Sequence, residues 1–169
     1  GGVGYVANLC SSFAQKTNII SFLGEKKDEK NFVLQNLSKK IKYNFLYKKN
    51  SPTIFKTRYL DDYRKSKIIG IYDLNDEPIS TSEEKKFFNF IKKHINKNDI
   101  IIVADYGHGI ITEKIRKLIL SHHNKLFLNT QINSFNRGYH TVFKYKRINT
   151  LVINDSELRY EIGDKNSSI

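Results

Sequence analysis

Residues 99–109, Asp-Ile-Ile-Ile-Val-Ala-Asp-Tyr-Gly-His-Gly, decide the fold. The apolar part is rich in β-branched residues, which suit a strand covered on both faces, and it is too short to span a membrane. A polar turn with two glycines follows at once, and a helix start lies at Thr112. Because ligands of open α/β sheets bind outside the carboxyl ends of the strands, Asp105 is the first candidate binding residue.

The same arrangement recurs twice toward the C-terminus. A short strand is predicted over residues 125–128 and runs into the amide-rich segment 129–134. Another is predicted over 150–153 and meets Asn-Asp-Ser-Glu at 154–157. Three strands that each end in a polar cluster indicate an α/β fold, in which a mostly parallel sheet is flanked by helices and carries a site at its carboxyl edge.

Two helices are predicted around the opening strand. The first starts near Ser80, where Thr81 and Glu84 have capping-box spacing, and the second covers residues 112–123. Each has one apolar face, which indicates packing against the sheet. The inward residues are Phe87, Phe88, Ile91 and Ile95 in the first helix and Ile111, Ile115, Leu118 and Ile119 in the second.

The N-terminal part also alternates between helix and strand. Its predicted elements are a helix over 1–14 with Val3, Val6, Cys10 and Phe13 on one face, a strand over 18–23, a helix over 25–40 with Val33, Leu37 and Ile41 on one face, and a strand over 43–47. Two further β-rich runs, 53–60 and 67–74, are joined by a charged link.

Period-two alternation places Lys56 and Arg58 on one face of the first of these runs, together with Ile54. Two cations on one strand face either coat an exposed edge or bind an anion. The pattern alone favours the edge interpretation, since lysine on an edge strand blocks unwanted pairing.

Length and composition limit the classes of protein that need to be considered. A chain of 169 residues is sized for one domain with a substantial core. Its 29 Lys plus Arg against 17 Asp plus Glu give a net charge of +12, which favours anionic partners without choosing among them. The single cysteine excludes an internal disulfide, and no signal peptide or membrane-spanning stretch is visible, so a cytoplasmic location is expected.

The chain lacks methionine and opens on Gly1-Gly2, so a processed product or a fragment is expected. Four short motifs occur in order along it, namely the Gly1-Gly2 pair, Ser-Pro-Thr-Ile-Phe-Lys-Thr-Arg at 51–58, Asp-Tyr-Gly-His-Gly at 105–109 and Asn-Asp-Ser-Glu at 154–157. Together these motifs resemble those of the ribokinase-like (PfkB) carbohydrate kinases, and most closely their heptose-phosphate kinase branch.

The resemblance implies a single partial kinase domain over residues 1–169, with a three-layer α/β core that is incomplete at its C-terminus and a small β lid over about 53–74. The sugar would lie between lid and core. Lys56 and Arg58 would reach a phosphate already on the substrate, and Asp105 would accept hydrogen bonds from sugar hydroxyls. The substrate-binding residues implied are Gly1, Gly2, Lys56, Arg58, Asp105, Tyr106, Gly107, Gln131 and Asn133.

The resemblance also implies ATP and Mg²⁺ as cofactors. Asn154 and Glu157 would belong to the phosphate and magnesium network, with Glu157 acting through water and no residue ligating the metal directly. The family's catalytic aspartate lies in a Gly-Ala-Gly-Asp turn, which is expected beyond Ile169. Residues 1–169 would then contain no catalytic residue and would be inactive alone.

Three positions depart from the family pattern. Tyr5 stands where an asparagine usually contacts the sugar, and His108 replaces a lysine. Asn-Thr-Gln at 129–131 replaces Asp-Pro-Lys. A change from charged groups to amides indicates a different substrate or a lost activity.

Three functions are therefore weighed. The first is the substrate-binding portion of a kinase for a sugar or sugar phosphate, and lids of this family often pair two subunits, so a homodimer through the lid is a candidate assembly. The second is a degenerate relative that binds a phosphosugar or sugar nucleotide without catalysis, next to a fused nucleotidyltransferase. The third is a nucleic-acid-binding module, ranked last because the basic residues are dispersed. The alternative to the first function is that Asp105, Lys56, Arg58 and Glu157 are ordinary turn, edge and cap residues.

Overall fold

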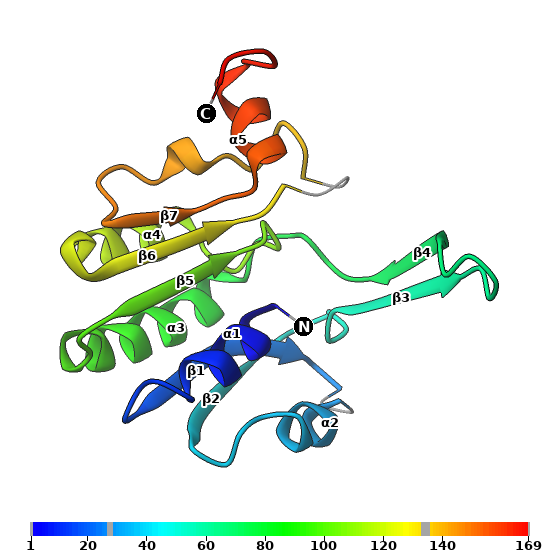
Figure 1. Cartoon of the computed structure of the whole chain (residues 1–169). Helices are drawn as coiled ribbons and strands as arrows, with labels where there is room; N and C mark the ends of the chain where they lie inside the picture. Colours follow the sequence, from blue (N-terminus) through cyan, green and yellow to red (C-terminus); the bar gives the residue numbers. More distant parts are fainter. Residues whose placement is uncertain (1, 27–28, 133–135, 169) are drawn as a thin grey trace. The chain divides into compact units, whose positions relative to one another are not determined.

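The computed structural model describes residues 2–26, 29–132 and 136–168. The chain divides into two compact units, residues 1–75 and 76–169, which we call the N-terminal and C-terminal units and describe separately (Figure 1). Within the described ranges, no helix is both long enough and apolar enough to cross a membrane.

The N-terminal unit contains a parallel two-stranded sheet. Strand β1 (Thr17–Gly24) pairs with β2 (Ile41–Lys48) in register from Thr17 opposite Ile41 to Gly24 opposite Lys48. Helix α1 (Gly2–Cys10) packs on this sheet through Ala7, which is buried with Ile19 and Ile41. Both strands form at the segments predicted for them, 18–23 and 43–47.

The second helix of this unit differs from its prediction. Instead of spanning residues 25–40, α2 covers only Lys30–Gln35. The side chain of Asn8 donates to the carbonyl of Asn36 at 2.7 Å and accepts from the main-chain N–H of Ser38 at 2.8 Å, so these groups leave the helix. Ile41, predicted on the helix face, begins β2 instead. Phe13 was predicted on the apolar face of α1 but lies beyond its end and is 86% exposed.

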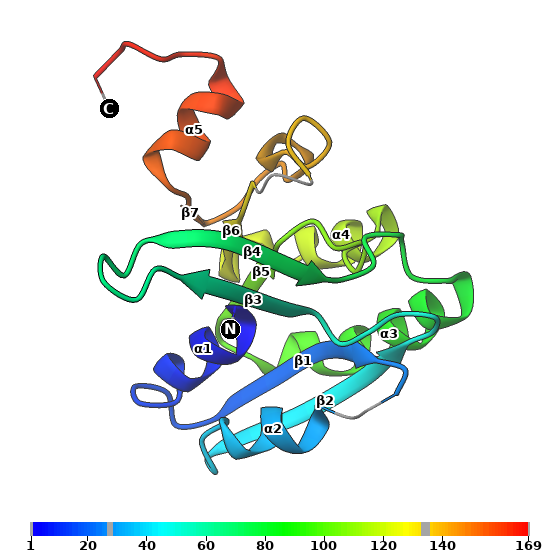
Figure 2. The same cartoon turned by 90° about the vertical axis from the view of Figure 1, so that its right-hand side faces the viewer.

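An antiparallel hairpin forms where the lid is predicted. Strand β3 (Phe55–Leu60) pairs with β4 (Lys67–Asp73), and Figure 2 shows the two strands running side by side as a ribbon. Lys56 lies opposite Tyr72 with its Nζ 5.6 Å from the centre of that ring, and Arg58 lies opposite Gly70. Both cations are exposed, so they are accessible to an anion.

The C-terminal unit contains a parallel sheet in the order β5-β6-β7. Its strands are β5 (Ile101–Asp105), β6 (Leu126–Thr130) and β7 (Thr150–Val152), and its helices are α3 (Thr81–His94), α4 (Glu113–Leu120) and α5 (Asp155–Ile162). Short 3₁₀ turns cover Ile95–Lys97, His123–Lys125 and Val142–Lys144. Parallel sheets flanked by helices confirm the predicted α/β class.

The core of this unit lies between the sheet and helices α3 and α4, which Figure 1 shows on one side of the strands. Ile115 of α4 and Leu126 of β6 are fully buried, and Leu128 is 1% exposed. The capping box of α3 is formed by Ser80 and Glu83, one residue before the predicted pair.

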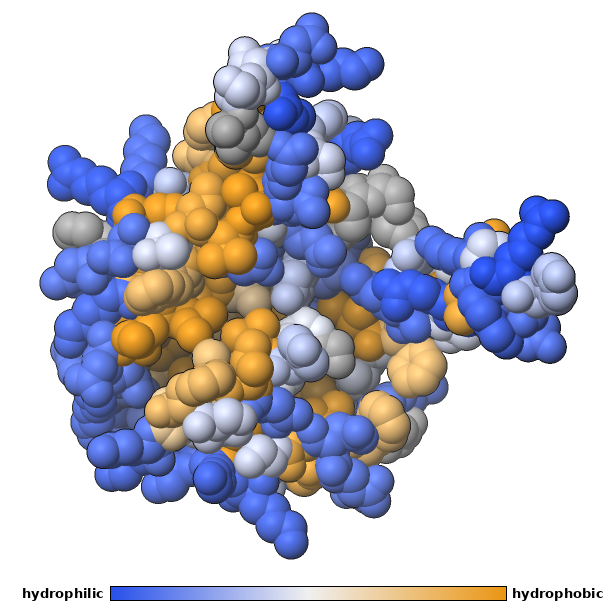
Figure 3. All heavy atoms as spheres, in the orientation of Figure 1, coloured by the Kyte–Doolittle hydropathy of each residue, from blue (hydrophilic) through white to orange (hydrophobic). Residues whose placement is uncertain are grey.

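On the opposite face of the sheet, the described residues of the C-terminal unit include exposed apolar side chains. Ile102 is 45% exposed, and Ile100, just before the strand, is 57% exposed. Val152 of β7 is also exposed. Figure 3 shows apolar side chains gathered on this side of the molecule. Strand alternation explains the asymmetry, since Val103 and Asp105 point to the helix side and Ile102 to the other.

Candidate functional site

Several predicted site residues lie in the C-terminal unit, at the carboxyl ends of β5 and β6 and at the start of α5. These residues are Asp105, Tyr106, Gly107, Gln131, Asn154 and Glu157. Gly2, Lys56 and Arg58 belong to the N-terminal unit, where Gly2 begins α1. Gly1 and Asn133 lie outside the described residues.

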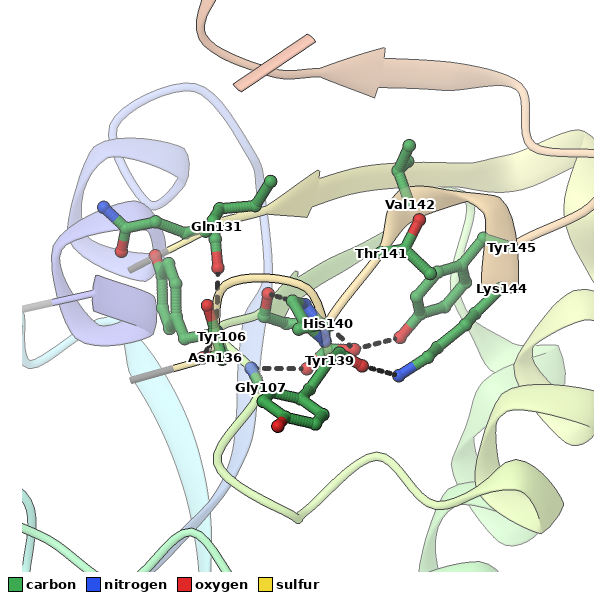
Figure 4. Close-up of polar contacts among 12 residues, drawn as sticks. Tyr106, Gly107, Gln131, Asn136, Tyr139, His140, Thr141, Val142, Lys144 and Tyr145 are labelled. Atoms are coloured by element: carbon green, nitrogen blue, oxygen red, sulfur yellow. Dashed lines mark hydrogen bonds and ion pairs between the residues drawn. The ribbon is translucent and has the colours of Figure 1, made fainter. Parts of the chain in front are cut away.

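The Asp105 side chain is buried, and each of its two oxygens accepts a hydrogen bond. Its Oδ1 accepts from the main-chain N–H of Gly107 at 3.1 Å, and its Oδ2 accepts from the hydroxyl of Tyr145 at 2.6 Å (Figure 4). Burial and the adjacent Asp105 carboxylate raise the pKa of Tyr145 far above its usual value of 10.0. The phenol therefore remains a proton donor throughout the neutral range, and Asp105 is its acceptor.

His140 contacts the main chain of the same residue. Its Nε2 lies 3.1 Å from the carbonyl oxygen of Asp105 and 3.8 Å from Oδ2. A carbonyl oxygen only accepts, so Nε2 carries the hydrogen in this contact. The same carbonyl also accepts from the main-chain N–H of Gln131 at 3.2 Å, so His140 strengthens the junction of β5 and β6.

Asn136 joins the two strand ends from the other side. Its Nδ2 donates to the carbonyl of Tyr106 at 3.0 Å and to the carbonyl of Gln131 at 3.2 Å. Asn136 is 5% exposed, so these carbonyls are satisfied by one amide in a place with little access to water. Burial also raises the pKa of the Tyr106 phenol above its usual value.

Gly107 packs against this cluster. Its φ is +72°, and a Cβ at this position would lie 2.5 Å from Nδ2 of Asn136 and 2.9 Å from Cγ of His140. Only glycine combines this backbone conformation with such close neighbours. The sequence singled out Gly107 as a substrate contact, and the structure adds a packing reason for a glycine there.

His108 and Gly109, the last two residues of the 105–109 turn, form hydrogen bonds with residues 76–79, which follow β4. The Nδ1 of His108 lies 2.7 Å from Oδ1 of Asp76, and the main-chain N–H of Ile79 donates to the carbonyl of Gly109 at 3.0 Å. His108 is buried. His108 thus has a partner, Asp76, within its own unit.

Glu157 connects α5 to the end of β6. Its Oε2 accepts from the main-chain N–H of Asn154 at 3.2 Å, and Asn154 in turn caps the helix through Ser156 N–H at 2.9 Å. The other oxygen, Oε1, accepts from Ile132 N–H at 3.0 Å. The two residues predicted for a phosphate and magnesium network therefore form a capping box that also anchors the β6 end.

The amino-acid sequence of the chain is similar to those of several known proteins. No protein-family model matches the chain. The chain is similar to proteins named bifunctional protein HldE. That of Aliarcobacter butzleri is 29% identical over 100% of the chain and 36% of the relative, and that of Nitratiruptor sp. is 26% identical over 71% and 25%.

The protein from Helicobacter pylori strain HPAG1 is 23% identical to the chain over 96% of its length and 34% of the relative. The chain thus spans about a third or less of the length of these HldE relatives. At these identities the similarity supports a related function.

Sequence reasoning missed the three residues that organise this site, namely Asn136, His140 and Tyr145. They lie in the long connection between β6 and β7, where no periodic pattern marks them. Buried asparagine, histidine and tyrosine side chains need hydrogen-bond partners, but their burial depends on the fold, so no local signal identifies these residues in the sequence.

Proposed function

We propose that this chain is the substrate-binding portion of an ATP-dependent kinase that transfers a phosphoryl group to a hydroxyl of a sugar or sugar phosphate of the heptose-phosphate type. The observation that carries the proposal is the Asp105-Tyr106-Gly107 turn at the carboxyl end of parallel strand β5, joined to the end of β6. Similarity to the HldE relatives supports it. The proposal includes that residues 1–169 belong to a single kinase domain.

In this proposal Asp105 accepts hydrogen bonds from sugar hydroxyls. Each carboxylate oxygen already accepts one hydrogen bond, from Gly107 or from Tyr145, and each keeps a second lone pair. The side chain is 9% exposed, so only a small part of it is accessible to a ligand. Gln131 and Tyr106 flank this point, and Asn133 remains a further proposed contact.

Lys56 and Arg58 of the hairpin are proposed to bind a phosphate group that the sugar already carries. Both side chains are exposed on strand β3, and a guanidinium matches two phosphate oxygens at once. The hairpin would act as a lid, and its exposed strands are also proposed to pair two copies of the protein.

ATP and Mg²⁺ are the proposed cofactors. Each oxygen of Glu157 accepts one backbone N–H and keeps a lone pair for a metal-bound water, which suits an ion that retains much of its hydration shell. Among the described residues, no group of three or more His, Cys, Asp or Glu side chains is placed to hold a metal. The residues thus fit an outer contact to Mg²⁺, which would supply charge neutralisation for the transferring phosphate.

The direct test is a phosphoryl-transfer assay on the full-length gene product. Purified protein with ATP and Mg²⁺ should phosphorylate a heptose phosphate, and the product is detected by phosphorus NMR and by ADP formation. Hexose phosphates and unphosphorylated heptose serve as comparison substrates. Absence of transfer to every sugar, with the folded protein present, would refute the proposal.

Replacing Arg58 by glutamine is expected to raise KM for a sugar phosphate about 10- to 150-fold, since a hydrogen bond to a charged group contributes about 1.5–3 kcal/mol. KM for ATP should stay unchanged. Arg64→Gln is the matched control. Arg64 lies in the link between β3 and β4, and its substitution removes the same charge as Arg58→Gln. Equal effects of the two variants would show that only the net charge matters.

The alternative is a kinase-like domain that binds a phosphosugar or sugar nucleotide without transferring phosphate. The segment Asn129-Thr130-Gln131 favours it, because these side chains carry no charge. Asn129 donates to the carbonyl of Val152 at 2.9 Å, and Thr130 is 2% exposed. Calorimetric binding of a heptose phosphate by a full-length protein that turns over no ATP would select this alternative.

A further inference from the structure

We infer that Asn136, His140 and Tyr145 are positioning residues that preset the sugar-binding turn, with Tyr145 holding the Asp105 carboxylate in the orientation in which it receives the sugar. The inference rests on the proposed function and goes beyond it, because these residues touch no substrate in the proposed arrangement. They act through Asp105 and through the main chain of the turn.

The carboxylate is oriented by two donors on opposite oxygens. Gly107 N–H binds Oδ1, and the Tyr145 hydroxyl binds Oδ2 at 2.6 Å. Tyr145 is 6% exposed and Asp105 is 7% exposed, so water competes little for this contact. In such surroundings a hydrogen bond to a charged acceptor is strong, and it limits rotation of the carboxylate.

The main chain of the turn is held by the other two residues. His140 contacts the carbonyl of Asp105, and Asn136 donates to the carbonyls of Tyr106 and Gln131. Consecutive carbonyls of the turn are thus bound by side chains of a single short segment. Figure 4 shows these side chains converging on the turn from the same loop.

The segment that carries these residues is itself anchored to α5. The carboxylate of Glu161 accepts from the hydroxyl of Thr141 and, at 3.2 Å, from the main-chain N–H of Val142. The guanidinium carbon of Arg116 lies 5.9 Å from the centre of the Tyr145 ring. Tyr145 therefore has a fixed location from which to direct Asp105.

A preset acceptor lowers the cost of binding, because the carboxylate need not be ordered when the sugar arrives. Removing the Tyr145 hydroxyl leaves the ring and its packing in place but frees the carboxylate to rotate. The loss should therefore appear in sugar binding and not in ATP binding or in the rate of phosphoryl transfer at saturation.

The test is Tyr145→Phe in the full-length kinase, with Tyr139→Phe as the matched control, because Tyr139 lies in the same loop and is 83% exposed. Tyr145→Phe should raise KM for the sugar phosphate about tenfold, while KM for ATP and kcat stay within about twofold. Tyr139→Phe should leave all three unchanged.

A double-mutant cycle shows whether Tyr145 acts through Asp105. In an Asp105→Asn background, Tyr145→Phe should change the sugar KM by less than about twofold, since the oriented carboxylate is already gone. Independent, multiplying effects of the two substitutions would overturn the inference. So would an unchanged sugar KM in Tyr145→Phe, or equal changes in the KM values for sugar and ATP.

If the wild-type protein transfers phosphate normally and Tyr145→Phe shows no selective rise in KM for the sugar phosphate, only this inference is refuted. A wild-type protein that transfers phosphate to no sugar removes the proposed function and this inference with it.

Discussion

Replacing Gly109 by alanine is expected to destabilise the C-terminal unit by about 3 kcal/mol or more, because a clash and a strained backbone add together. The residue has φ +73°, and its Cβ would lie 2.1 Å from the carbonyl oxygen of Glu77. The backbone of residue 77 would have to move, and the hydrogen bond from Ile79 N–H to the Gly109 carbonyl would be lost. Urea unfolding followed by circular dichroism measures the effect.

Gly163→Ala is the matched control for this prediction. Gly163 ends helix α5 with φ +67°, and a Cβ there would meet no atom of the described residues within 4 Å. Its substitution should cost only the conformational penalty of a left-handed residue, about 1 kcal/mol. Equal losses of stability in the two variants would show that the close approach of Gly109 to Glu77 contributes nothing.

Asn136→Asp should be the second severe substitution, with a loss of about 3 kcal/mol or more at neutral pH. The change replaces the Nδ2 donor by an oxygen that faces the carbonyls of Tyr106 and Gln131, and it places a charge at a site that is 5% exposed. Asn149→Asp is the control, because Asn149 is exposed and its Nδ2 donates to a single carbonyl, that of Asn124.

The loss in Asn136→Asp should depend on pH in a definite direction. Burial beside two carbonyls raises the pKa of the new carboxyl in the folded protein, while its pKa in the unfolded chain stays at about 3.9. The destabilisation relative to wild type should therefore be smallest below about pH 4 and grow as the pH rises. A pH-independent difference between variant and wild type would mean that the carboxylate finds a donor.

Local patterns predicted most of the elements. The strands near residues 18–23, 43–47 and 101–105 form where apolar residues alternate or run together, and the hairpin forms at its two β-rich runs. Such patterns depend on neighbours in sequence, so they can be recognised without knowing the fold. The helix predicted over 25–40 forms only at Lys30–Gln35, and just beyond its end a side chain distant in sequence, Asn8, binds main-chain groups of Asn36 and Ser38 that would continue it.

The residues of the candidate site divide in the same way. Asp105 was predicted as a binding residue because it stands at the end of an apolar strand, and Gly107 because the turn 105–109 resembles a motif of the kinase family. His140 and Tyr145 could not be found, since they contact Asp105 across 35 and 40 residues of sequence and belong to a connection without periodicity. Only the folding of that connection over the strand ends brings them there.

The sequence by itself determined the α/β class and the parallel arrangement of the strands in the C-terminal unit. It also determined the position of Asp105 at the end of one of these strands. Each of these follows from apolar periodicity and from the fixed geometry of strands and helices. The tertiary structure decided what surrounds Asp105. Hydrogen bonds from Tyr145, His140 and Asn136 arise from contacts between distant segments, and these contacts depend on the path of the connecting loop, which no local pattern encodes.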